Sequence, residues 1–395
     1  MNPSEKSAVS EGRQSLRTLE SLASLLETSA QIERIETVRS TIQPNVTHVV
    51  VTDTDGVTGL GETFDGASSV EAHLHDVIAP TFSTERPAAS PLSVSVLNEG
   101  YVGYSGSGAE VRARSALDLA LWDLVATRHS NWGFSKDNRP SGDFEDLWAF
   151  LNEPARLARE LVESGFQGMK VWPFDLVAEK TQGGIDADLS FGLSVLDSIR
   201  NEVGMDIDLY LELHSLWQPE AAHQLVKEVE RFSLSWVEDP IRADNMGQLA
   251  RLREKATMPI ACGENLGSGA NGYPAMIEQQ AVDVMIMDLG WCGGITDALP
   301  IISASDEAGM TSAFHDCTGP VSLAVATQVS LASPSTSVQE VARSFWHGWY
   351  PQMANGYPDL VGGVLLANDV PGHGCELTRE FLSSARSTVR SSLLK

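Results

Sequence analysis

The sequence has 395 residues, a length that predicts two domains or one large barrel. Of these residues 42% are hydrophobic and 20% charged, which is typical of soluble globular proteins. Its 27 basic residues against 53 acidic ones give a formal net charge of −26, which argues against nucleic acid or an anionic membrane as a partner. No apolar segment approaches the roughly 18 residues of a membrane span, and the four cysteines form no CxxC pair, so we expect a cytoplasmic protein with reduced thiols.

The first part of the chain is predicted to form an extension and a small domain. Residues 1–31 lack the continuous apolar segment of a signal peptide and predict a mobile extension. Residues 32–130 predict an α+β domain, because "THVVVTDTDGVTGLGETF" has the pattern of two strands around an Asp-Gly turn. Two helices are expected after it, over "SSVEAHLHDVIAPTF" and "EVRARSALDLALWDLVAT". The polar residues 131–145 predict a linker.

Residues 146–365 are predicted to form a barrel of parallel strands. Short apolar strands alternate with helical segments, and this pattern is typical of βα units. No glycine-rich nucleotide loop follows the first strand, which favours a barrel over a doubly wound sheet. The expected strands are "DLWAFL", "GMKVW", "IDLYLEL", "LSWVEDP", "MPIACGEN", "VDVMIMD", "TSAFHD" and "STSVQE".

Six of these strands end in a polar residue at a regular interval. The positions are 212, 238, 264, 288, 315 and 340, which lie between 24 and 27 residues apart, about the length of one βα unit. Repeated units place such residues at the same level of a sheet, and barrel enzymes keep their active sites at the carboxyl ends of the strands. We therefore expect these six side chains to surround one site.

The first three of the six are glutamates, Glu212, Glu238 and Glu264. Converging negative charges repel one another unless a cation neutralises them, and an all-oxygen ligand set suits Mg²⁺. The alternative is three unrelated surface glutamates, but their equal spacing after apolar strands favours a metal site.

Two histidines are candidates for proton transfer. Asp288 and His315 end neighbouring predicted strands, where the carboxylate can orient the imidazole as a general base. The alternative is a polar pair that caps the barrel. His214 lies two residues after Glu212, so on a strand both side chains face the same way, and His214 can protonate a leaving hydroxyl. A structural histidine is the alternative.

Five further residues are site candidates, Lys170 for catalysis and the other four for contact with the substrate. Lys170 and Trp172 lie two apart in "GMKVW", where the lysine can balance the carboxylates, hold an anionic substrate or remain solvated, and the tryptophan can form a pocket wall or pack. Glu340 can bind the substrate or cap a helix. Asp316 and Trp346 follow the last two predicted strands and complete the set.

Taken together, these motifs resemble those of the enolase superfamily, in its mandelate racemase/muconate lactonizing enzyme group. The resemblance runs from about residue 32 to residue 377 and is carried, in order, by "DGVTGLGET", "SALDLALWDL", "VEDP", "CGEN", "DLGWCGGIT" and "PGHGCEL". It implies an α/β fold class, a modified (β/α)₇β TIM barrel with an N-terminal α+β capping domain. It further implies that residues 366–395 return to the cap and that the protein is a homo-oligomer.

The resemblance also implies a reaction. Members of the superfamily use Mg²⁺, here on Glu212, Glu238 and Glu264, and a base, here the dyad His315–Asp288, to remove the proton α to a carboxylate. Racemases of the group carry a Lys-x-Lys motif, whereas here Trp172 replaces the second lysine. The "ELH" motif instead resembles galactonate dehydratase-like members, in which a histidine helps the β-hydroxyl to leave. We therefore expect a Mg²⁺-dependent dehydratase that converts a sugar acid into a 2-keto-3-deoxy acid.

Three alternatives remain open from the sequence. A cycloisomerase of a sugar lactone or anhydro-sugar acid needs the same base and metal, and Lys170 can then act on the opposite face. An epimerase or racemase of a carboxylate substrate needs a second base. A barrel that binds a sugar acid without turnover predicts no exchange of the α-proton.

Overall fold

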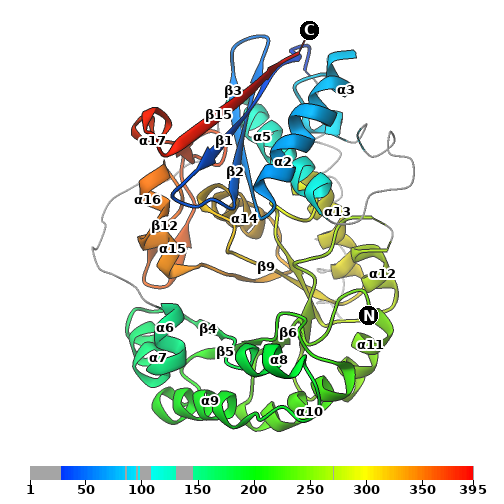
Figure 1. Cartoon of the computed structure of the whole chain (residues 1–395), viewed down its shortest axis with the longest axis vertical. Coiled ribbons are helices and arrows are strands. Elements are labelled where there is room, and N and C mark those ends of the chain that lie inside the picture. The colour runs from blue at the N-terminus through cyan, green and yellow to red at the C-terminus, as the bar shows by residue number, and fades with distance from the viewer. Residues whose placement is uncertain are drawn as a thin grey trace, which may run out of the picture.

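The computed structural model describes residues 28–84, 87–94, 97, 108–129, 146–269 and 271–394. The predicted linker at 131–145 and residues 1–27 of the predicted extension lie outside this part of the chain. Figure 1 shows an antiparallel cap sheet packed beside a curved sheet whose outer side is covered by helices. No helix among the described residues is long and apolar enough to cross a membrane.

The cap sheet has four antiparallel strands in the order β15-β1-β2-β3. The predicted hairpin is confirmed, because β2 and β3 pair from Val46↔Phe64 to Thr52↔Thr58 around a turn in which Gly56 has a φ of 82°. The fourth strand comes from the far end of the described chain. The strands are β1 (Ile32–Ser40), β2 (Val46–Asp53), β3 (Thr58–Phe64) and β15 (Ser387–Leu393).

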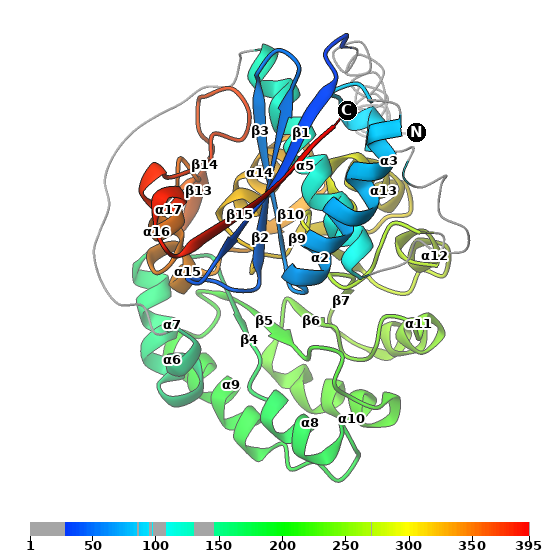
Figure 2. The ribbon, with the colours of Figure 1, turned by 45° about the horizontal axis from the view of Figure 1, so that its top comes forward.

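Helices cover one face of the cap sheet, as Figure 2 shows, and both predicted helical regions are confirmed. They are α2 (Ala67–His73), a π-helical turn (Leu74–Ile78), α3 (Ala79–Thr84) and α5 (Ala109–His129), with a short 3₁₀ turn at Pro91–Val94. Helix α5 packs so closely on β3 that a Cβ atom at Gly61 would lie 2.0 Å from the carbonyl oxygen of Ala116. Glycine at this position is therefore a packing requirement.

The second sheet has seven parallel strands in sequential order, from β4 to β10. Parallel neighbours place all the carboxyl ends at one edge, which is the arrangement of a modified (β/α)₇β barrel. The strands are β4 (Gly168–Val171), β5 (Asp208–Glu212), β6 (Trp236–Glu238), β7 (Ile260–Cys262), β8 (Val284–Met287), β9 (Thr311–Phe314) and β10 (Thr336–Gln339).

Helices alternate with these strands and cover the outer side of the sheet (Figure 1). They are α7 (Pro154–Glu163), α8 (Asp175–Thr181), α9 (Ser190–Val203), α10 (Pro219–Val229), α11 (Met246–Lys255), α12 (Tyr273–Glu278), α13 (Gly294–Glu307) and α14 (Pro320–Ala332). The chain then forms α15 (Arg343–His347), α16 (Tyr350–Met353), β11 (Ala354–Asn355), the hairpin β12 (Asp359–Val361) and β13 (Val364–Leu366), β14 (Glu376–Leu377) and α17 (Arg379–Ser383).

One predicted strand is wrong. The segment "DLWAFL" lies in helix α6 (Asp146–Asn152). Ala149 and Phe150 are buried next to each other while Trp148 is exposed, which is a helical pattern of burial and not the alternation of a strand. The guanidinium of Arg343 donates to both carboxylate oxygens of Asp146, at 2.9 and 2.7 Å, and holds this helix beside α15.

Hydrogen bonds tie the cap to the loops of the barrel. Glu62, at the end of β3, accepts hydrogen bonds from the main-chain nitrogens of Val321 and Ser322 at 3.0 and 2.9 Å. The Thr63 hydroxyl donates to the carbonyl oxygen of Gly290 at 2.6 Å. Glu62 thus accepts hydrogen bonds from the N-terminus of α14, the helix that follows His315. The capping domain therefore holds one side of the predicted site in place.

Candidate active site

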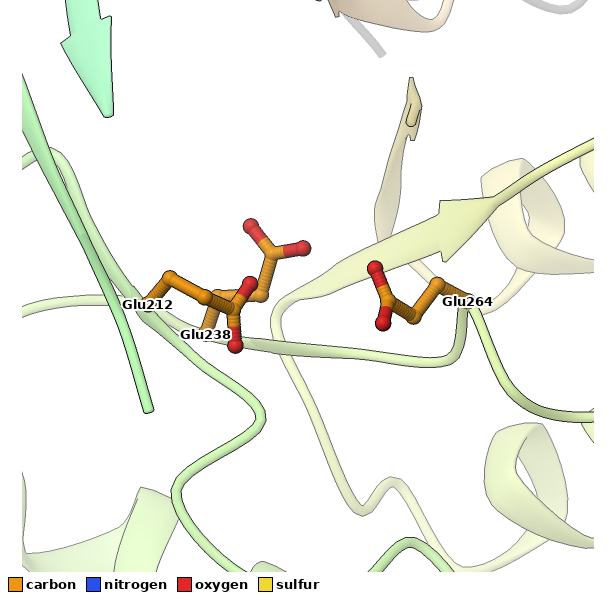
Figure 3. A group of neighbouring side chains, drawn as sticks. All are labelled: Glu212, Glu238 and Glu264. Atoms are coloured by element: carbon orange, nitrogen blue, oxygen red, sulfur yellow. The ribbon is translucent and has the colours of Figure 1, made fainter. Parts of the chain in front are cut away.

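Three buried glutamates converge at the carboxyl edge of the parallel sheet. Glu212 and Glu238 end β5 and β6 in matching register, and Glu264 follows β7 by two residues. One carboxylate oxygen from each lies within 4.8 Å of the others, and Figure 3 shows Glu264 pointing toward the other two. The three glutamates that the regular spacing of strand ends predicted to lie close together, Glu212, Glu238 and Glu264, are therefore neighbours in the structure.

The chemistry of this cluster fits a hard divalent cation. The Glu212 Oε2 atom is buried and has no hydrogen-bond partner within the described chain. Burial raises the pKa of Glu212 to about 8, although the charge of Lys170 opposes this shift. Three clustered carboxylates suit a metal such as Mg²⁺, because such a cation would stabilise all three charged forms.

Lys170 lies among the carboxylates. Its Nζ atom is 2.6 Å from Glu340 Oε1, 3.2 Å from Glu238 Oε1 and 3.5 Å from Glu212 Oε2. Burial lowers the pKa of this lysine, but the surrounding carboxylates outweigh burial and raise it above the usual value. Lys170 is therefore a cation that balances the acidic cluster, and the solvated alternative is excluded by its small exposure of 16%.

His315 and Asp288 form a buried pair. His315 Nδ1 is 3.0 Å from Asp288 Oδ2, which also accepts a hydrogen bond from the Thr318 hydroxyl at 2.7 Å. The main-chain nitrogen of Gly290 donates to Asp288 Oδ1 at 2.8 Å. With Nδ1 held by Asp288, Nε2 lies 3.2 Å from Glu264 Oε2 and faces the acidic cluster. This arrangement can place a general base beside a substrate that is held at the acidic cluster.

His214 lies in a turn after strand β5, and not on the strand as the sequence predicted. Strand β5 ends at Glu212, and His214 and Ser215 adopt left-handed φ values of 45° and 59°. The expected alternation of faces is thus wrong, because the chain has already left the extended conformation. The tight turn instead lets the main-chain nitrogen of His214 donate to Glu212 Oε1 at 2.7 Å.

The imidazole of His214 forms a second pair with an aspartate. His214 Nδ1 is 2.7 Å from Asp175 Oδ2, at the start of α8. Burial lowers the pKa of His214, but the hydrogen bond and charge of Asp175 outweigh it, so the net shift is upward. The side chain is 40% exposed, which leaves the ring accessible as a proton donor.

The predicted substrate contacts separate into two groups. Trp172 lies beside His214, with its ring centroid 5.7 Å from that of His214 and 4.7 Å from that of Phe150. Glu340 also remains at the site through its ion pair with Lys170. Both are therefore placed to line the space next to the carboxylates.

Asp316 and Trp346 are instead engaged within the protein. The carboxylate of Asp316 accepts hydrogen bonds from the Ala342 nitrogen at 2.8 Å and from the Tyr350 hydroxyl at 3.2 Å. The Trp346 indole is buried and donates to the carbonyl oxygen of Pro358 at 3.0 Å. These bonds use the polar atoms that a substrate would need, and they favour a structural role for both residues.

Asp175 and Thr318 are functional candidates that sequence reasoning missed. Both lie a few residues beyond a strand end, Asp175 after β4 and Thr318 after β9. The regular spacing selects one polar residue for each strand, whereas the residues beyond the strand ends supply Asp175, the partner of His214, and Thr318, which donates a hydrogen bond to Asp288. The signal that could have found them is the presence of an aspartate or threonine in those loops.

Two parts of the chain match known protein families. Residues 24–132 match the family described as "Mandelate racemase / muconate lactonizing enzyme, N-terminal domain", and residues 153–381 match "Enolase C-terminal domain-like". A D-galactonate dehydratase from Ralstonia pickettii is 25% identical over 88% of this chain and 92% of its own length. A D-gluconate dehydratase from Thermoproteus tenax is 25% identical over 72% of this chain and 58% of its own length.

Solved structures resemble the whole described fold. An enolase protein from environmental sequencing of the Sargasso Sea is 36% identical, with a TM-score of 0.82 over 92% of this chain and 99% of its own. An enolase of the mandelate racemase subgroup from Agrobacterium tumefaciens is 35% identical, with a TM-score of 0.80 over the same shares of the two chains.

Proposed function

Because this chain belongs to the mandelate racemase/muconate lactonizing enzyme group of the enolase superfamily, we propose that it is a Mg²⁺-dependent acid-sugar dehydratase. The proposed reaction removes the proton α to the carboxylate of a sugar acid, eliminates the β-hydroxyl and gives a 2-keto-3-deoxy acid. Relatives named as galactonate and gluconate dehydratases support a lyase that acts on a small carboxylate.

The observation that carries this proposal is the position of the buried base beside the acidic cluster. His315 Nε2 lies 3.2 Å from Glu264, while Nδ1 is held by Asp288. A base in this position can take the proton from the carbon next to a carboxylate that is held at the cluster. The hydrogen bond that Nδ1 donates to Asp288 stabilises the imidazolium that forms.

Glu212, Glu238 and Glu264 are the residues that would hold Mg²⁺. When bound, Mg²⁺ supplies positive charge that polarises the substrate carboxylate and lowers the cost of removing the α-proton. Lys170 adds a second positive charge at the same cluster.

The second histidine supplies the proton that the leaving group needs. As the electrons of the C2–H bond form a C2–C3 double bond, the β-hydroxyl leaves and takes a proton from His214 to become water. Asp175 orients His214 and favours its protonated form. The enol product then tautomerises to the 2-keto acid, so one water is lost and both histidines exchange their protons with solvent.

The contacts of Lys170 disfavour a two-base racemase. A second base would have to be unprotonated, whereas the Lys170 ammonium is paired with Glu340 and Glu238. A cycloisomerase would use the same base with a ring oxygen as leaving group, so the products have to separate it from a dehydratase.

The test is to incubate the protein with Mg²⁺ and a panel of sugar acids, lactones and anhydro-sugar acids in D₂O, and to follow proton NMR. We expect loss of the α-proton signal and new methylene signals from an open-chain acid. Methylene product from cyclic compounds alone would replace the dehydratase with a cycloisomerase, and exchange without elimination would replace it with an epimerase. No change across the panel, with Mg²⁺ bound, would overturn the proposal.

A further inference from the structure

An arginine from the cap reaches into the barrel near the proposed base. Arg112 belongs to helix α5, yet its guanidinium carbon lies 4.1 Å from the ring centroid of Trp291, which follows β8. Its Nη1 atom donates to the carbonyl oxygen of Phe64 at 2.7 Å. A stacked guanidinium with one anchored nitrogen is held in a defined orientation, and among the described residues no further hydrogen bond of this guanidinium is found.

Arg112, which is half-buried, differs from the buried arginines Arg114 and Arg343 in what it contacts. Arg114, two residues further along the same helix, pairs with Asp297 at 2.8 Å, and Arg343 pairs with Asp146 at 2.7 Å. Within the part of the chain that the structure describes, Arg112 forms no ion pair with a carboxylate. The charges of Asp288, Asp65 and Glu264 act on it only from beyond ion-pair distance, so an anion from outside would be the first to contact the guanidinium directly.

Trp291 connects this arginine to the proposed base. The centroid of its ring lies 5.0 Å from that of the His315 imidazole, so a single indole separates the guanidinium from the histidine. The Trp291 Nε1 atom is buried without a hydrogen-bond partner among the described residues. The charge of Asp288 also acts on Arg112, which agrees with a location close to the dyad.

We propose that Arg112 binds a second carboxylate, at the far end of the substrate, and that the substrate is therefore a dicarboxylic sugar acid. The first carboxylate is assigned to the cluster of Glu212, Glu238 and Glu264 and to Lys170, and in this respect the inference rests on the proposed function. A guanidinium matches a carboxylate with two parallel hydrogen bonds, which a neutral terminal hydroxyl cannot provide. The inference also separates this chain from relatives that are named for monocarboxylic acids.

The test measures binding separately from turnover. In the Mg²⁺-loaded full chain carrying His315→Asn, which stops the reaction, calorimetry compares D-galactonate with the six-carbon diacid of the same configuration. We expect the diacid to bind about tenfold more tightly or better, since a charge-assisted pair is being added. Adding Arg112→Gln should remove most of this gain and leave the affinity for D-galactonate within about threefold.

Two further variants control the experiment. Arg112→Lys keeps the charge but loses the two parallel hydrogen bonds of the guanidinium. We therefore expect its preference for the diacid over D-galactonate to lie between that of the parent and that of Arg112→Gln. Arg231→Gln removes an exposed arginine that pairs with Asp197, and should change neither affinity. Equal affinity of the parent for the two acids, or equal weakening of both by Arg112→Gln, would overturn the inference and leave Arg112 as a packing residue for Trp291.

Turnover of the unmutated protein distinguishes this inference from the proposed function. If D-galactonate is dehydrated while the diacid binds no better, the inference fails and the dehydratase stands. If the diacid binds in an Arg112-dependent manner but no acid sugar loses its α-proton, the dehydratase fails and the second-carboxylate site stands.

Discussion

Two histidine–aspartate pairs flank the same acidic cluster, with nearly equal contact distances and very different surroundings. His315 and Asp288 are 3.0 Å apart and expose 9% and 1% of their side chains, whereas His214 and Asp175 are 2.7 Å apart and expose 40% and 19%. The buried aspartate accepts further hydrogen bonds from Thr318 and Gly290. The same two residue types therefore form one rigid, dry pair and one pair open to water.

This difference suits the two proposed roles. A base that removes a weakly acidic proton from carbon gains from a fixed position in a water-poor environment, where charges interact strongly. An acid that releases a hydroxyl as water gains from contact with solvent, because the new water must leave and the histidine must be reprotonated. The variants below test whether burial does divide the two roles in this way.

Replacing the buried histidine should have the largest effect. In His315→Asn we expect exchange of the α-proton in D₂O to fall by about 10³- to 10⁴-fold, because general-base catalysis is lost. Proton NMR gives the exchange rate, and calorimetry with Mg²⁺ should show that metal binding persists. Exchange within tenfold of the parent rate would remove His315 as the base.

Replacing the open histidine should affect the second half of the reaction more than the first. In His214→Asn we expect elimination to fall by about 10²- to 10³-fold, while α-proton exchange falls much less. The same NMR experiment reports both rates from separate signals. A parallel fall of the two rates would contradict the division of roles and assign His214 to substrate binding or to the base step.

Removing the charge of the open aspartate should give a smaller loss with a shift in pH dependence. Asp175 raises the pKa of His214 against the opposing effect of burial, and the proposed acid must be protonated. Activity that depends on His214 is therefore lost as pH rises through this pKa, and Asp175→Asn should move that loss to lower pH. We expect a decrease of about tenfold in kcat at the parent's optimum.

The matched control for this variant is Asp197→Asn, which removes an exposed carboxylate that pairs with Arg231 on the surface. It should leave the pH profile of kcat in place. If the decrease of kcat at high pH occurs at the same pH in Asp175→Asn as in the parent, the aspartate does not set the protonation of His214.

Loosening the buried pair should have the smallest effect. Thr318→Val removes one hydrogen bond to Asp288 but leaves those from His315 and Gly290, so we expect kcat to fall about threefold and the free energy of unfolding by about 1 kcal/mol. Thr327→Val removes another buried hydroxyl, bonded to the Leu323 carbonyl in α14. Thr327→Val should lower the free energy of unfolding in chemical denaturation by a similar amount but leave kcat unchanged. If kcat falls equally in the two variants, the effect of Thr318→Val on kcat is purely structural.

The parts of the site that follow from local, repeated structure were predictable from the sequence. Glu212, Glu238 and Glu264 converge because parallel βα units repeat at a nearly constant length and bring their strand ends to one edge. The pairing of His315 with Asp288 follows for the same reason, since β8 and β9 are neighbours.

The parts that depend on turns or on distant segments were not predictable in this way. The left-handed turn at His214 breaks the alternation that placed its side chain, and Asp175 approaches it from the start of α8, 39 residues earlier in the chain. The contact between Arg112 and Trp291 joins two domains, and no local pattern encodes it. The short apolar segment that begins at Asp146 could form either a strand or a helix, and packing beside α15 decided for the helix.

The pairing of β15 with β1 has a consequence for how the chain is made. The two strands join from Arg34↔Leu393 to Ser40↔Ser387, so the cap sheet combines segments from opposite ends of the described chain. During synthesis on the ribosome, β1 emerges long before its partner and presents an open edge to other nascent chains until the whole barrel has followed. A chaperone that covers this edge until β15 has been made should therefore raise the yield of native protein in the cell.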